Sequence, residues 1–252
     1  MATLFIGQNK IFLPETESTN SYAIELLKNV NVIEGTVVYT HKQTHGKGQR
    51  GNLWIAEPER NATFSLILKP SFLNPKNSFY LSKICALTLH DVLTEILNTG
   101  QFDIKIKWPN DMLVNGKKIA GILIENSISN DVLQWTVAGV GININQKLFD
   151  QIKAATSLCL LSQKETAVED VMDRFYTHFE KWYLRLKKAE LKLINETYHK
   201  VLFEMGKTNT FEKDAKRFKA KVIGVDESGL LILETEDGSV NNYDIKEITF
   251  IY

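Results

Sequence analysis

The sequence predicts an α+β fold with two domains, and three observations support that prediction. The expected strands and helices come in a mixed order, without the regular alternation that is typical of a doubly wound parallel sheet. The centre of the chain contains a hairpin, because Asn115-Gly116 between two apolar runs is the favoured pair for a tight primed turn. After Met205-Gly206 the pattern changes to short strands. We therefore expect a larger domain over residues 1–206 and a small β domain over residues 207–252.

Four helices are expected in the larger domain. Residues 18–30 form the first, because Ser18 or Thr19 can cap a segment that has apolar residues on one side. Residues 78–97 repeat apolar side chains at helical spacing and form the second. Two amphipathic helices then fill roughly residues 165–200. The helices therefore lie on both sides of the central hairpin in the sequence.

The expected strands of the larger domain lie between these helices. Residues 35–40 are rich in β-branched side chains, and residues 62–69 alternate apolar and polar side chains as a half-buried strand does. Residues 102–108 form a strand with lysines at alternate positions. Residues 112–125 form the hairpin, and residues 132–144 form a further strand.

Composition indicates an ordinary globular protein of the cytoplasm. Hydrophobic residues make up 44% of the 252 residues and charged residues 24%. Thirty basic residues balance thirty acidic ones, so we expect no nucleic-acid partner, because such domains usually have a basic surplus. No secretory signal is visible, and no apolar run approaches the roughly 20 residues that span a bilayer, so no membrane association is expected. Cys85 and Cys159 have apolar neighbours and are interpreted as reduced core residues.

A glycine-rich loop, Gly46–Gly51, formally matches the dinucleotide-binding pattern GxGxxG. That pattern needs a helix directly after the glycines and an acidic residue about twenty positions later, and neither is present here. The glycines would still let backbone amides approach a ligand, and Lys47 and Arg50 add positive charge for a phosphate. A solvated basic loop is an equally good interpretation of this segment alone.

The segment Lys107-Trp108-Pro109-Asn110-Asp111 combines a cation, an aromatic ring, a rigid turn, an amide and a carboxylate at a strand end. Taken alone, an ordinary Pro-Asn-Asp turn is the favoured interpretation.

Two further segments place small residues in apolar strands. Gly121 lies inside such a strand, where glycine usually marks a close backbone approach. Strand alternation could point Lys118 into a site while Lys117 and Ile119 face the other way, although both lysines could instead be solvated hairpin residues. Residues 139–143 end a strand with two glycines and an amide, and a plain strand-to-turn transition would explain them equally well.

Together these segments resemble those of the biotin protein ligases. The matching segments are Glu15–Asn20, Gly46–Gly51 with Trp54, Lys107–Asp111, Lys118–Ile122 and Gly141–Asn143, in the family's order. They span about half the chain and are much more specific together than singly. The resemblance implies a mixed-sheet catalytic domain of the biotin/lipoate ligase type, followed by a small SH3-like β-barrel domain. Some members have an N-terminal DNA-binding domain, for which we expect no room before Ser18.

The resemblance also implies an activity, that of a biotin–[acetyl-CoA-carboxylase] ligase. Such enzymes use ATP, with Mg²⁺, to convert biotin to biotinyl-5′-AMP, and then transfer biotin to one lysine of a biotin carboxyl carrier protein. ATP and biotin are then substrates, the carrier protein is the partner, and the enzyme is a monomer or a homodimer. The alternatives are a lipoate-type protein ligase and a biotin sensor without enzymatic activity. The segment Lys107–Asp111 favours biotin over lipoate.

Site residues follow from the same resemblance. Hydroxyl and amide groups suit the ureido ring of biotin, which offers both donors and acceptors. The implied biotin-binding residues are Ser18, Thr19, Asn20, Gln43, Gly46, Lys47, Gly48, Gln49, Lys118 and Gly121. The implied ATP- and adenylate-binding residues are Lys47, Gln49, Arg50, Gly51, Trp54, Asn110, Lys118 and Asn143. The implied catalytic residues are Lys118, Arg50 and Asp111, of which Asp111 is also the expected Mg²⁺ ligand.

The glycine-rich loop departs from the family's common pattern, Gly-Arg-Gly-Arg-Arg-Gly. Lys47 and Gln49 replace its first two arginines. Gln49 supplies neither a charge nor a guanidinium fork, so we expect the loop to hold the adenylate less firmly.

Overall fold

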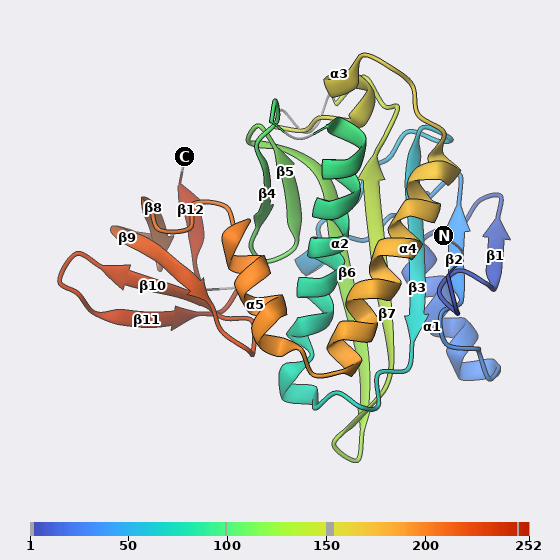
Figure 1. Ribbon diagram of the computed structural model, residues 1–252, viewed down its shortest axis with the longest axis horizontal. Helices are drawn as coiled ribbons and strands as arrows, with labels where there is room; N and C mark the ends of the chain where they lie inside the picture. The colour runs from blue at the N-terminus through green and yellow to red at the C-terminus, as the bar shows by residue number, and fades with distance from the viewer. Residues whose placement is uncertain (1–2, 99, 150–153, 246, 252) are drawn as a thin grey trace.

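The computed structural model describes residues 3–98, 100–149, 154–245 and 247–251, and it contains two β-sheets (Figure 1). The larger sheet has seven strands in the order β1-β2-β3-β7-β6-β5-β4. Its strands are β1 (Lys10–Leu13), β2 (Val37–Thr40), β3 (Asn61–Leu68), β4 (Ile104–Lys107), β5 (Asp111–Val114), β6 (Lys117–Ser129) and β7 (Val132–Asn143). β1 and β2 are parallel and the other pairs are antiparallel, so the predicted mixed-sheet α+β class is confirmed.

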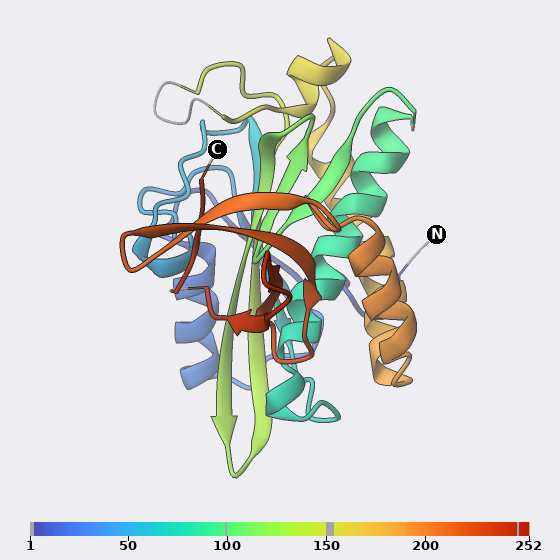
Figure 2. The same cartoon turned by 90° about the vertical axis from the view of Figure 1, so that its left-hand side faces the viewer.

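Helices cover both faces of this sheet. They are α1 (Thr19–Asn29), α2 (Phe79–Leu97), the short α3 (Leu158–Ser162), α4 (Val168–Lys187) and α5 (Leu191–Lys200). Figure 2 shows α1 on one side of the sheet and α2 and α4 on the other. The strand β1 and the helix α3 were not predicted, since each has only four or five residues and so shows too little periodicity.

The prediction of a half-buried strand over residues 62–69 is wrong. All eight residues of β3 are buried. β3 lies between β2 and β7, with α1 packed on one face and α4 on the other. The polar side chains in its alternating pattern therefore face the interior of the protein.

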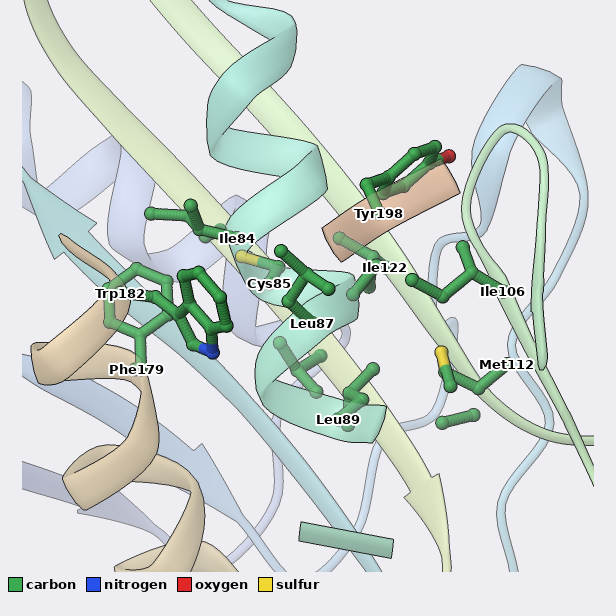
Figure 3. Close-up of a cluster of buried hydrophobic side chains, with 14 of the residues drawn as sticks. Ile84, Cys85, Leu87, Leu89, Ile106, Met112, Ile122, Phe179, Trp182 and Tyr198 are labelled. Atoms are coloured by element: carbon green, nitrogen blue, oxygen red, sulfur yellow. The ribbon is translucent and has the colours of Figure 1, made fainter. Parts of the chain in front are cut away.

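The main core lies between the sheet and the α2–α4–α5 layer (Figure 3). Ile84 and Leu87 of α2 pack there with Phe179 of α4, Tyr198 of α5 and Ile122 of β6. Removing such a side chain from water contributes roughly 1.5–3 kcal/mol. Cys85 and Cys159 are buried and free, as predicted. In the described part of the chain, no helix is both long and apolar enough to cross a membrane.

The hairpin predicted at Asn115-Gly116 joins β5 to β6. Both residues have positive φ, 50° and 76°, as a tight primed turn requires. The turn pairs Leu113 with Lys118, and an irregularity between Met112 and Leu113 then shifts the register so that Asp111 of β5 pairs with Gly121 of β6. The hairpin therefore brings together two of the segments that the sequence singled out.

A second, antiparallel sheet forms the C-terminal β domain. It contains β8 (Thr208–Lys213), β9 (Lys216–Val225), β10 (Leu231–Thr235), β11 (Val240–Tyr243) and β12 (Thr249–Ile251), in the order β11-β10-β9-β8-β12. The linker after α5 pairs with β4: the Ile106 amide donates to the Val201 carbonyl (2.9 Å), and the Phe203 amide donates to the Ile106 carbonyl (2.8 Å). The linker thus fixes the point where the second domain leaves the first.

Candidate active site

A cavity of about 380 Å³ collects the predicted segments of the larger domain and is also lined by residues of the C-terminal β domain. It is lined by residues 18–20, 43, 47–50, 52–54, 64, 107–111, 118, 121–123, 139–141, 245 and 248–250. The central strands β3, β5, β6 and β7 provide its floor, and the loop after β2 provides one wall. The segments quoted from the sequence thus converge on one place.

Most of the predicted site residues line this cavity. They are Ser18, Thr19, Asn20, Gln43, Lys47, Gly48, Gln49, Arg50, Trp54, Asn110, Asp111, Lys118 and Gly121. Three predicted residues lie outside the lining: Gly46, Gly51 and Asn143. Asn143 is 4% exposed, and its amide donates to the Thr156 carbonyl at 3.0 Å. The Thr156 amide donates to the Lys118 carbonyl at 2.8 Å, so Asn143 is linked to the backbone of Lys118.

One end of the cavity is a buried polar network at the start of α1. Ser18 occupies the N-cap position, but its side chain makes no capping hydrogen bond, so its hydroxyl is free of that role. The backbone amide of Thr19 donates to Gln43 Oε1 at 2.9 Å, and the Thr19 hydroxyl lies 3.2 Å from the same oxygen. These groups offer hydrogen-bond donors and acceptors within a small buried volume, which suits a neutral polar ring.

Two residues that the sequence analysis missed hold this network in place. The Ser65 hydroxyl lies 2.8 Å from Thr19 Oγ1 and 2.5 Å from Asn20 Oδ1. The Asn20 amide nitrogen donates to Glu125 Oε2 at 2.8 Å. Ser65 belongs to the alternating pattern of β3, and Glu125 is a carboxylate in an apolar stretch of β6, which was the available signal. Together they fix the orientation of the Asn20 amide.

The opposite part of the cavity is strongly cationic. Lys47, Arg50, Lys107 and Lys118 line it, and Asp111 is the carboxylate among the described lining residues. Lys118 Nζ lies 2.6 Å from Asp111 Oδ1, in an ion pair whose angles are not those of a hydrogen bond. Burial lowers the pKa of Lys107, and Lys118 adds to that effect while Asp111 opposes it. This surplus of positive charge suits an anionic, phosphate-bearing ligand.

Trp54 lies against paired glycines on the floor of the cavity. Gly121 and Gly141 face each other across β6 and β7. A Cβ on Gly141 would lie 2.2 Å from the Trp54 ring, and one on Gly121 would lie 3.2 Å from it. Gly141 is therefore needed for the indole to lie in this place, and Gly121 leaves the ring little room to spare. The Lys118 ammonium is 5.7 Å from the centre of the ring, within range of a cation–π contact.

The glycine-rich loop folds back on itself beside the cavity. The Trp54 amide donates to the Gly46 carbonyl at 2.8 Å, and the Gly48 amide donates to the Asn52 carbonyl at 2.7 Å. A Cβ on Gly46 would lie 2.3 Å from the Trp54 carbonyl oxygen, so Gly46 shapes the loop rather than the cavity wall. Arg50 has a left-handed φ of 61°. The next regular element after the loop is the strand β3 and not an α-helix, which agrees with the rejection of the dinucleotide-binding pattern.

The C-terminal β domain supplies a wall that was not predicted. Ile245, Ile248, Thr249 and Phe250 line the cavity next to Lys107, whose ammonium lies 5.9 Å from the centre of the Phe250 ring. These residues form no motif, and only the folded chain brings them to the cavity.

The fold and the cavity define a class of protein that binds a neutral polar ring and, next to it in the same cavity, an anionic group. Comparisons with known proteins identify the class further. The family model described as the biotin/lipoate A/B protein ligase family matches residues 12–143. That match covers more than half of the chain, and the chain belongs to this family.

Individual relatives are similar over most of their length. The bifunctional ligase/repressor BirA of Bacillus spizizenii is 32% identical over 245 residues, covering 94% of this chain and 73% of that protein. The biotin–[acetyl-CoA-carboxylase] ligase of Paracoccus denitrificans is 28% identical, covering 90% of this chain and 94% of that protein. The biotin protein ligase of Aquifex aeolicus, solved in complex with biotin and ATP, has a TM-score of 0.78 and 26% identity over 97% of this chain and 99% of that chain.

Proposed function

We propose that the protein is a biotin protein ligase, which activates biotin with ATP and transfers it to a lysine of a biotin carboxyl carrier protein. The observation that supports this best is the adjacency of two environments in one cavity. The buried network of Thr19, Asn20 and Gln43 lies at one end, and the cationic group around Lys118 lies at the other. Family membership and the biotin- and ATP-bound relative support the same function. We place the enzyme in the cytoplasm, where ATP is available.

The polar network would bind the ureido ring of biotin. Ser18 and Asn20 are 2% and 3% exposed, so hydrogen bonds to them form away from water. A buried polar group left without a partner costs about 1–3 kcal/mol, so this end of the cavity disfavours a ligand that lacks matching donors and acceptors. Lipoate has an apolar dithiolane ring in place of the ureido group. The network therefore favours biotin.

In the first half-reaction a carboxylate oxygen of biotin attacks the α-phosphorus of ATP. The bond between that phosphorus and the bridging oxygen breaks, and pyrophosphate leaves. Negative charge gathers where two anions meet, and Lys118 supplies positive charge from the cationic end of the cavity. Its contact with Asp111 fixes the ammonium before substrates arrive. Such preorganised charge stabilises the transition state without reorganisation during the reaction.

Mg²⁺ would enter this site together with ATP. The described residues contain no cluster of three or more metal-ligating side chains, and Asp111 is the carboxylate among the described lining residues. A single carboxylate is enough for Mg²⁺, which commonly binds one or two carboxylates and completes its coordination shell with phosphate oxygens and water. Asp111 would be the protein ligand, and the metal would neutralise phosphate charge.

In the second half-reaction the carrier lysine attacks the acyl carbon of biotinyl-5′-AMP. The new bond joins the lysine nitrogen to that carbon, the carbon–oxygen bond to the phosphate breaks, and AMP leaves. The lysine must lose a proton, and Asp111, if it does not remain bound to the metal, would accept it. Arg50 and Lys47 lie on the loop that borders the cavity and would cover the adenylate, which must be kept from water.

Pyrophosphate release should require biotin. Purified protein with ATP, Mg²⁺ and biotin should release pyrophosphate, and replacing biotin by lipoate should abolish most of the release, because the polar network has no partner in lipoate. Equal or greater release with lipoate would assign the protein to the lipoate branch. Biotin binding without any release of pyrophosphate would support the alternative that the protein is a biotin sensor without enzymatic activity.

Replacing Gln49 by arginine should slow the loss of the adenylate into solvent. Gln49 lines the cavity on the glycine-rich loop, and arginine would add a charge and a guanidinium fork for the phosphate. One charge-assisted hydrogen bond contributes about 1.5–3 kcal/mol, so the off-rate of biotinyl-5′-AMP should fall by roughly tenfold or more. The off-rate is measured by chasing labelled adenylate.

Hydrogen exchange of the loop amides gives the second measurement. Wild-type amides over residues 46–51 should exchange faster without ligand than with biotin and ATP, because few backbone bonds close this glycine-rich loop. Gln134→Arg on the exposed face of β7 is the matched control and should leave the off-rate unchanged. Faster loss of adenylate from Gln49→Arg would contradict the role assigned to Gln49.

A further inference from the structure

Lys83 of α2 is fully buried and lies outside the cavity lining. Its ammonium donates to Asn195 Oδ1 of α5 at 2.7 Å, to the Asp226 carbonyl at 3.0 Å and to the Val225 carbonyl at 3.3 Å. An ammonium has three N–H donors, so this arrangement uses all of them. Two of the three acceptors belong to the backbone of the C-terminal β domain.

The environment of Lys83 makes it an unusual core residue. The centres of the Tyr80, Tyr198 and Phe79 rings lie 5.1, 5.5 and 5.7 Å from the ammonium. Burial lowers the pKa of Lys83 to about 8, although Asp226 and Glu227 oppose that effect. An apolar side chain at a buried position is commonly at least as stable as a buried charge. Lys83 therefore contributes directional hydrogen bonds between the two domains, which an apolar side chain at the same position could not form.

Two other side chains hold the same turn, residues 226–229 between β9 and β10. His199 Nε2 lies 3.0 Å from the Val225 amide nitrogen and 3.1 Å from the Val225 carbonyl oxygen, at the start of the turn. Burial, with a contribution from Lys83, lowers the pKa of His199, although its hydrogen bond with the Val225 backbone opposes that effect, so the neutral imidazole is favoured. The indole N–H of Trp108 donates to the Gly229 carbonyl at 2.8 Å and is buried. The turn is thus fixed at both ends.

The turn also fits closely against α2. Gly229 has a φ of +99°, and a Cβ there would lie 2.5 Å from the Phe79 ring. Inside the turn, Asp226 Oδ1 accepts from the amides of Gly229 and Leu230, both at 2.9 Å. The turn is therefore held by its own hydrogen bonds and packs closely against α2. As a result, the position of α2 determines the position of the second sheet.

The anchored turn has a direct connection to the cavity. Trp108 belongs to the segment that contains Asn110 and Asp111, and it lines the cavity itself. The domain that the turn fixes contributes Ile245 and residues 248–250 to the wall near Lys107. Movement of the turn would therefore move this wall relative to the cationic end, while the polar network beside α1 would keep its place.

We propose that Lys83 is a positioning residue, which locks the β9–β10 turn so that the C-terminal β domain closes the nucleotide end of the cavity. This inference rests on the proposed function, because it assigns the cationic end to ATP. It implies that ATP binding requires the joint between the two domains, by which we mean the contacts of the β9–β10 turn with Lys83, His199 and Trp108. Biotin binding does not require this joint.

The test is Lys83→Met, which keeps the length and the apolar stem of the side chain. It removes the three hydrogen bonds that the ammonium donates to Asn195, Val225 and Asp226, so the KM for ATP in biotin-dependent pyrophosphate exchange should rise by about tenfold or more. The Kd for biotin should stay within about twofold, because the hydrogen bonds described for the polar network join α1 to Gln43, β3 and β6 and do not reach the turn. Amides of residues 247–251 should exchange faster, and those of β3 should not. Lys192→Met is the matched control, since Lys192 is an exposed lysine on neighbouring α5 and its side chain is 90% exposed.

Asn195→Ala is a milder second variant, which decides the question if Lys83→Met does not fold. It removes one of the three acceptors of Lys83, and the KM for ATP should rise by a few-fold with biotin binding unchanged. An unchanged KM for ATP in the folded variants, or an equal loss of ATP and biotin binding, would overturn the inference while the proposed function stands. Wild-type protein without biotin-dependent exchange would instead refute the proposed function.

Discussion

Replacing Lys118 by alanine should lower kcat for adenylate formation by about 10²–10³-fold, the usual cost of losing one preorganised charge at a reacting group. Lys118 lies 2.6 Å from Asp111 and belongs to the cationic end of the cavity. Its charge matters most as negative charge gathers at the α-phosphate, so the loss should appear in kcat more than in the Kd for biotin. Single-turnover formation of biotinyl-5′-AMP measures this directly.

Lys117→Ala provides the matched control for this variant. Lys117 precedes Lys118 on β6 and is exposed, so removal of its charge should leave turnover nearly unchanged. The thermal midpoint of both variants should stay close to that of the wild type, because neither side chain belongs to the core. Normal turnover in Lys118→Ala would make Lys118 a solvated hairpin residue and refute the assignment.

Replacing Gly139 by alanine should raise the Kd for biotin by about 10–100-fold. A Cβ on Gly139 would lie 2.3 Å from Asn20 Oδ1, so the Asn20 amide must move. That amide is held by Ser65 and Glu125 at 2.5 and 2.8 Å, so movement breaks buried hydrogen bonds at a cost of about 1–3 kcal/mol. Isothermal titration with biotin in the absence of ATP gives the Kd.

A double-mutant cycle separates this effect from a general distortion of β7. Asn20→Ala alone should weaken biotin binding by a similar factor. In the Asn20→Ala background, Gly139→Ala should add little, because the amide that the new Cβ would meet is gone. Additive losses would show that Gly139 acts elsewhere than on Asn20.

The sequence predicted the parts of the site that are local in the chain. The turn signal at Asn115-Gly116 located the hairpin, and strand alternation offered the cavity as one of two directions for Lys118. The register shift between Met112 and Leu113, which pairs Asp111 with Gly121, had no signal in the sequence. The polar residues before α1 could be recognised because Ser18, Thr19 and Asn20 are adjacent.

The parts that sequence reasoning missed depend on pairing between distant segments. Ser65 reaches Asn20 only because β3 becomes a central strand with both faces covered, and a period-two pattern does not distinguish that position from a half-buried one. Trp108 and Gly229 are 121 positions apart in the chain and meet through the domain joint. Lys83 lies in a helix whose apolar spacing gives no sign that this lysine is buried. It becomes buried because the second sheet packs beside it.

The linker that pairs with β4 has a consequence for how the molecules can associate. An outer strand with free amides and carbonyls is a template onto which a strand from another molecule can add. At Ile106 both backbone groups already bond to Val201 and Phe203 of the same chain. Recruitment of a foreign strand at this edge would first require the linker to be displaced, so the junction between the domains also guards the sheet against intermolecular β-sheet growth.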